Sequence, residues 1–194
     1  MRDFIFFPLA ALLACGMVFV AIMPAFGAKP SGPVTGDGVN YDRIEVSGDL
    51  LYKLIAGGDI KTEMKEAPDG ENRLLIEVEA GALADGVEYG PHFRLAADIE
   101  TQFAGRRVRV TISAEPAEIK GAEQLLVNYS AGRAGESGWE VFDLGQQKRD
   151  VSFEYKVPNV QGDQASDYLG IRPVVPDGYR GVLISKIVLQ RLPD

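Results

Sequence analysis

Six residues between positions 92 and 172 have side chains of the kinds that recognise sugars. An aromatic ring can lie against the C–H face of a pyranose, and amide or guanidinium groups can bond neighbouring hydroxyls. Tyr168 and Arg172 are an even number of positions apart, so they share one face of a predicted strand. The predicted ligand-binding residues are His92, Arg94, Asn128, Trp139, Tyr168 and Arg172.

These residues also have purely structural interpretations. The only tryptophan, Trp139, is of a residue type that more often packs at a core or rim. Arg94 and Arg172 are typical of solvated positions or of ion pairs with acids on adjacent strands. His92 is the only histidine and cannot form a metal site by itself. The sequence leaves open which interpretation holds at each position.

The chain carries no motif of a known catalytic mechanism. No Gly-x-Ser-x-Gly sequence and no phosphate-binding glycine loop is present. A pair of carboxylates for glycoside hydrolysis remains an alternative, because distances in space are not visible in a sequence. Because no catalytic motif is present, we predict that the protein is not an enzyme. The net charge of −8 also argues against nucleic acid as a partner, because an acidic domain repels it.

Alternating apolar residues predict an all-β fold. In the stretch 138–158, Val151, Phe153, Tyr155 and Val157 fall on one face of a strand, which places Tyr155 in the core. A preceding strand and a polar turn at Gly145 suggest a hairpin, which needs a second sheet to cover it. We predict no helix after residue 40. The other predicted strands are Tyr41–Val46, Leu50–Leu54, Ile60–Glu66, Asn72–Ala80, Pro91–Ile99, Arg106–Ala114, Gln124–Ser130, Tyr168–Val174 and Gly181–Arg191.

The last of these strands has apolar residues on both faces and is predicted to lie in the middle of its sheet. The domain therefore closes only when the C-terminal strand is added.

An uncharged run from Phe4 to Ala28 opens the chain. At about 1.5 Å per residue, a helix of this length could cross the roughly 30 Å hydrocarbon core of a membrane. We favour an uncleaved transmembrane anchor over a signal peptide cleaved after Gly27, because the apolar run exceeds the usual length of a signal segment. Cys15 lies in a sequence similar to a lipoprotein box, but more apolar residues follow it, which favours a simple membrane residue.

The sequence thus predicts three parts and a compartment. Residues 1–28 form the anchor or signal peptide, residues 29–40 a linker rich in proline and glycine, and residues 41–194 one β-sandwich domain. The domain is expected in the cell envelope, in the periplasm or outside the cell, and secreted if the first segment is cleaved. It contains no cysteine, so it must be stable without disulfides.

Four pieces of the second half resemble the galactose-binding-like jelly-roll carbohydrate-binding modules, notably the CenC type. The resemblance is specific only in the last third of the chain. It implies a jelly-roll sandwich that holds a sugar on a concave sheet or loop rim, in many members with a structural calcium ion. Such domains commonly carry an acid in the closing strand, where this chain has Ser185 and Lys186, so we predict no cofactor. The pieces are Ser137 to Leu144, VSFEYKVP, DYLGIRP and VLISKIVLQRL.

The sequence therefore predicts a membrane-anchored, extracytoplasmic, non-catalytic module that binds a glycan or an envelope polysaccharide. Two alternatives remain. One is a structural sandwich that docks an envelope protein, and the other is a glycan-active enzyme.

Overall fold

The computed structural model describes residues 3–22, 29–58, 60–67, 69–82, 85–159 and 166–193. The chain divides into two compact units, Met1–Pro30 and Ser31–Asp194. The first contains helix α1, Asp3–Ile22. Within the described ranges, none of the helices is both long and apolar enough to span a bilayer, so the predicted transmembrane helix is not confirmed.

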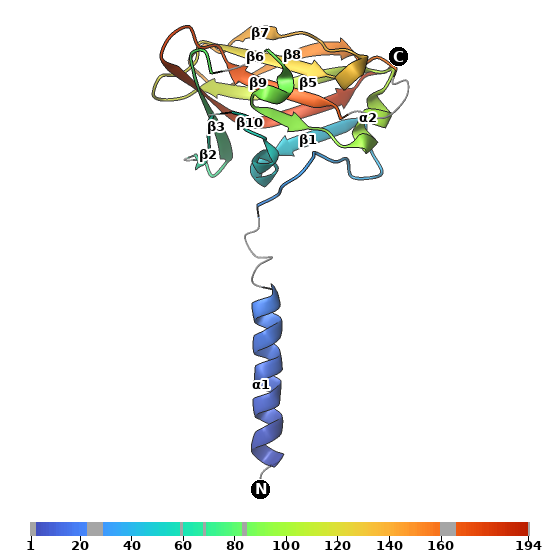
Figure 1. Ribbon diagram of the computed structural model, residues 1–194, viewed down its shortest axis with the longest axis vertical. Helices are drawn as coiled ribbons and strands as arrows, with labels where there is room; N and C mark the ends of the chain where they lie inside the picture. Colours follow the sequence, from blue (N-terminus) through green and yellow to red (C-terminus); the bar gives the residue numbers. More distant parts are fainter. Residues whose placement is uncertain are drawn as a thin grey trace. The chain divides into compact units, whose positions relative to one another are not determined.

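Two antiparallel sheets make up the second unit and pack face to face as a β-sandwich (Figure 1). We call them the long sheet, with the order β2-β3-β10-β5-β8 and β1 also paired to β10, and the short sheet, with the order β4-β9-β6-β7. The all-β prediction is thus confirmed. The strands are β1 Arg43–Ser47, β2 Lys61–Glu66, β3 Asn72–Glu79, β4 His92–Arg94, β5 Arg107–Pro116, β6 Gln124–Ser130, β7 Glu140–Asp143, β8 Arg149–Lys156, β9 Tyr168–Pro173 and β10 Tyr179–Arg191.

Strand β10 occupies the middle of the long sheet, as its two apolar faces predicted. One of its edges pairs with β5 along most of its length. The other edge is shared, because Tyr179 to Ile184 pair with β3 and Lys186 to Gln190 pair with β1. The register shifts at Ser185, where the strand changes partner. The C-terminal strand therefore joins three others, and the sheet is complete only when it is in place.

The core lies between the sheets, and buried apolar residues alternate with exposed polar residues along the strands. On β5, Val108 and Val110 are buried, whereas Arg107 and Arg109 are exposed and form ion pairs with Glu154 on β8. Tyr155 is half-buried, with its ring centroid 5.7 Å from that of Tyr129 on the short sheet. The assignment of Tyr155 to the core side is confirmed.

The predicted hairpin over residues 138–158 is not a hairpin. Strand β7 pairs with β6 in the short sheet, whereas β8 pairs with β5 in the long sheet, so the connection at Gly145 crosses between the layers. Phe142 and Phe153 meet across the core, with ring centroids 6.2 Å apart. Alternation along a strand shows which face is buried but does not show which strand lies beside it.

Two predicted strands contain helical turns instead. The segment predicted as strand Leu50–Leu54 lies mostly in a 3₁₀ helix, η2, Gly48–Lys53, which buries Leu51. The segment Pro91–Ile99 is extended only as β4, and helix α2, Ala97–Phe103, follows it. Helix α2 buries Ile99 and Phe103, which are spaced i, i+4 on one helical face. Short 3₁₀ helices also occur at Val87–Tyr89 (η3) and Gly132–Ala134 (η4).

Val34, within the predicted linker, packs against the sandwich. It is 3% exposed and lies beside Leu95, with its amide donating to the Arg94 carbonyl at 2.7 Å. Its own carbonyl accepts from the Ala96 amide at 2.8 Å. The chain before β1 therefore contributes one buried side chain to the edge next to β4.

Candidate functional site

The outer face of the short sheet collects the predicted site residues from three adjacent strands. Residues directly opposite each other in an antiparallel pair share a face, as do residues two apart on one strand. Asn128 and His92 both pair with Gly170, at the centre of β9. The structure therefore places these predicted residues on neighbouring strands, which the sequence could not show. The two flanking rows are Arg94, Tyr168 and Ser130 on one side, and Arg172 and Leu126 on the other.

Trp139 joins these residues from the segment just before β7. It is half-buried, and the Arg172 guanidinium carbon lies 3.7 Å from the centroid of its ring. This is a cation–π contact, which holds the indole in place. A Cβ on Gly170 would lie 2.9 Å from the indole Cη2 atom, so the ring lies across the glycine. The absence of a side chain at Gly170 thus lets the Trp139 ring pack against the sheet.

Replacing Gly170 with alanine is expected to displace Trp139. The added Cβ would approach both the indole and the Val87 Cγ1 atom to 2.9 Å, closer than such atoms tolerate. Overpacking of this kind costs about 1–3 kcal/mol. We expect a lower melting temperature and a changed fluorescence spectrum of Trp139. An unchanged spectrum would contradict the placement of the ring over Gly170.

Asn128 and His92 lie on this face but are buried. Asn128 is 1% exposed; its amide donates to Glu136 at 2.8 Å and its carbonyl accepts from the Ser137 hydroxyl at 3.2 Å. His92 is 4% exposed, with Nδ1 2.8 Å from the Gly90 carbonyl oxygen. Both residues tie loops to the sheet, so a ligand would reach them only if those loops moved. Their predicted role in ligand binding stays a prediction.

The accessible part of the face differs from the predicted set. Arg94 is exposed, and its Nε donates to the Ser166 hydroxyl at 2.8 Å. Tyr168 is half-buried, with its ring centroid 5.3 Å from that of His92 in an edge-to-face contact. Val141 on β7 is 54% exposed and lies opposite Leu126, beyond Arg172. Sequence reasoning missed Val141, because the pairing of β7 with β6 was not predicted.

A buried acid lies directly before Tyr168. Asp167 is 1% exposed and accepts a hydrogen bond of 2.5 Å from the Tyr129 hydroxyl. Burial raises the pKa of Asp167 to about 6; the bond from Tyr129 lowers it, and the charge of Glu100 raises it further. Its other oxygen, Oδ1, has no partner in the described structure. The acid is a structural group with an unfavourable charge rather than part of the outer face.

The chemistry of the face is that of non-covalent binding. It offers an indole held by a guanidinium, a tyrosine ring, an exposed arginine and an exposed valine. Within the part of the chain that the structure describes, no group of three or more His, Cys, Asp or Glu side chains is placed to hold a metal ion.

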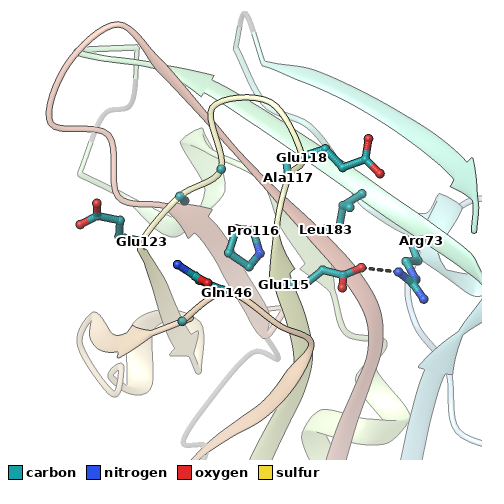
Figure 2. A pocket seen from close by; sticks show the side chains of 11 residues that line it. Arg73, Glu115, Pro116, Ala117, Glu118, Glu123, Gln146 and Leu183 are labelled. Carbon is teal, nitrogen blue, oxygen red and sulfur yellow. Dashed lines mark hydrogen bonds and ion pairs between the residues drawn. The ribbon is translucent and has the colours of Figure 1, made fainter.

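Two hollows lie elsewhere, beside the loop that follows β5. One has a volume of about 440 Å³ and the other about 380 Å³. In the first, the Glu115 side chain points toward Arg73 and the two form an ion pair, with Pro116 and Gln146 nearby (Figure 2). None of the six predicted site residues lines either hollow.

Comparison with solved structures supports the fold. The chain is similar to the CBM22-1 xylan-binding domain of Paenibacillus barcinonensis Xyn10C, with 11% identity, a TM-score of 0.50, and coverage of 78% of this chain and 94% of that domain. The CBM22-2 xylan-binding domain of the same protein gives 11% identity and a TM-score of 0.50, covering 72% and 91%. No family model and no curated protein matches the sequence. The second unit therefore has the β-sandwich fold seen in these carbohydrate-binding modules.

Proposed function

We propose that the domain is a non-catalytic carbohydrate-binding module that holds a glycan chain on the outer face of its short sheet. The observation that carries this proposal is the gathering of Trp139, Tyr168 and Arg94 on one face, with Arg172 bracing the indole. Trp139 precedes β7, Tyr168 lies on β9 and Arg94 lies on β4, so these groups come from separate parts of the chain. The fold shared with two xylan-binding domains supports the same class of ligand.

Binding would use two kinds of contact. The exposed part of the Trp139 ring stacks on the C–H face of a sugar, and the neighbouring Val141 extends the apolar platform. The guanidinium of Arg94 and the hydroxyl of Tyr168 bond hydroxyls of the sugar at the other side of the face. Because Arg172 already contacts the indole, it keeps that ring rigid, which lowers the entropy lost when a ligand binds.

A neutral polysaccharide suits the domain better than an acidic one, because the net charge of −8 repels polyanions. The uncharged run at the N-terminus supports a location in the cell envelope, with the glycan outside the cytoplasm. Whether the first segment is an anchor or a cleaved signal, and whether the module belongs to the CenC type, stay predictions. No bond is made or broken in this function, and no cofactor is required.

Affinity electrophoresis of the full chain in gels containing xylan, mixed-linkage glucan or galactomannan tests this function. We expect at least one of these polysaccharides to retard the protein, and addition of the matching free oligosaccharide to restore its mobility. Equal mobility in all the gels, together with a stable complex with an envelope protein, would favour the alternative of a protein-docking sandwich.

A further inference from the structure

The smaller of the two hollows described above lies on the outer face of the long sheet and has features of a sugar site. It has a volume of about 380 Å³, within the range of roughly 300–1,000 Å³ that is typical of small-molecule sites. Its lining comes from β2, β3, the start of β10 and the loop after β5. The lining residues used below are Lys61, Lys65, Arg73, Leu75, Ile119, Tyr179 and Leu183.

The apolar part of this hollow could receive the C–H face of a sugar ring. Leu183 on β10 lies directly opposite Leu75 on β3, so the two side chains share the outer face. Leu75 is 3% exposed, whereas Tyr179 is 38% and Ile119 is 72% exposed. Exposed apolar side chains around a hollow are in contact with water. A ligand that covers them removes this contact, which makes binding more favourable. The tyrosine supplies an aromatic wall of the kind that sugars contact.

The cations that line the hollow are already paired with carboxylates. The pKa of Lys61 is raised, mainly by its hydrogen bond to Glu77 and slightly by Tyr179. Glu66 and Glu118 also line the hollow and add negative charge, which disfavours an anionic ligand. Ion pairs at a rim still offer donors and acceptors to hydroxyl groups. The pairs are Lys61 with Glu77, Lys65 with Glu63, and Arg73 with Glu115.

We infer that this hollow is a second glycan-binding site, in which a neutral sugar stacks on Tyr179 above Leu75 and Leu183. The inference rests on the proposed function for the class of ligand, but it uses residues of the other sheet. The 440 Å³ hollow of Figure 2 adjoins it and shares Arg73, Ala117, Glu118 and Leu183 with it, so a chain of more than one sugar has room to continue. With two sites on opposite faces, one molecule would bridge two polysaccharide chains, and binding would gain from avidity.

The test is a titration of the ¹⁵N-labelled full chain in detergent micelles with xylohexaose, cellohexaose and mannohexaose. We expect saturable shifts of the amides of Leu75, Tyr179 and Leu183 with at least one of them. Tyr179→Ala should weaken binding at this hollow tenfold or more, while Tyr179→Phe keeps the ring and the affinity. The fluorescence response of Trp139 should be the same in both variants.

The outcomes separate the two sites. Shifts confined to the short sheet would overturn the second site and leave the proposed function standing. Shifts confined to the Tyr179 hollow would support the second site and overturn the placement of the first. Absence of shifts with all three oligosaccharides would overturn both.

Discussion

Replacement of Trp139 by alanine is expected to weaken glycan binding about 30-fold. Removal of a central aromatic from an interface commonly costs about 2 kcal/mol or more, which corresponds to that factor. The loss has two sources, because the variant removes the stacking ring and leaves the Arg172 guanidinium without its support. Isothermal titration calorimetry of the full chain with the polysaccharide that retards it in gels measures the change.

Two control variants make this result specific. Trp139→Phe retains an aromatic ring but lacks the distal indole atoms that lie over Gly170, and it should lose less affinity than the alanine variant. Val39→Ala changes a residue that is 91% exposed and lies before β1, so it should leave binding unchanged. Circular dichroism and a thermal melt show whether each variant folds. Equal affinity of Trp139→Ala and the unmodified chain, with both folded, would contradict the proposed surface.

Acidification from pH 7 to pH 4 is expected to stabilise the domain through Asp167. Burial raises the pKa of this acid from its ordinary value of 3.8 to about 6 in the folded protein, so the folded state binds the proton more tightly than the unfolded state. The stabilisation is therefore complete below about pH 3.8 and is lost as the pH rises through about 6. A shift of this size corresponds to about 3 kcal/mol in the free energy of unfolding.

Asp167→Asn should flatten this dependence. The amide carries no charge, and its oxygen can still accept the hydrogen bond from Tyr129. Its NH₂ group would occupy the position of Oδ1, which has no partner among the described residues, so the variant pays a cost that does not vary with pH. Denaturant unfolding between pH 4 and pH 8 measures the effect. An unmodified domain whose stability falls between pH 7 and pH 5 would show that Asp167 does not dominate the response.

The sequence predicted the strands well where one face of each strand is buried. The alternation in β8 placed Val151, Phe153, Tyr155 and Val157 on the core side, because a period of two leaves little ambiguity. It failed at α2, where Phe93, Leu95, Ala97 and Ile99 continue the strand pattern although the chain turns into a helix after Ala96. Short helices that bury only two or three side chains do not produce a distinct pattern.

The site was predicted in part for a related reason. The even spacing of Tyr168 and Arg172 along one strand predicted that they share a face. The structure places Arg94 on the neighbouring strand, directly opposite Tyr168. The burial of His92 and Asn128 could not be predicted, because the hydrogen bonds of these side chains to Gly90 and Glu136 form only in the folded chain. The stacking of Arg172 on Trp139 likewise depends on the pairing of strands that are distant in sequence.

The most direct test of the glycan-binding surface uses Trp139 itself, because it is the only tryptophan in the chain. Its fluorescence is recorded while the full chain is titrated with xylohexaose and the other oligosaccharides. The proposed function predicts a saturable change in intensity or wavelength as the oligosaccharide binds. Binding by calorimetry without any change in the Trp139 signal would contradict the placement of the glycan on the short sheet.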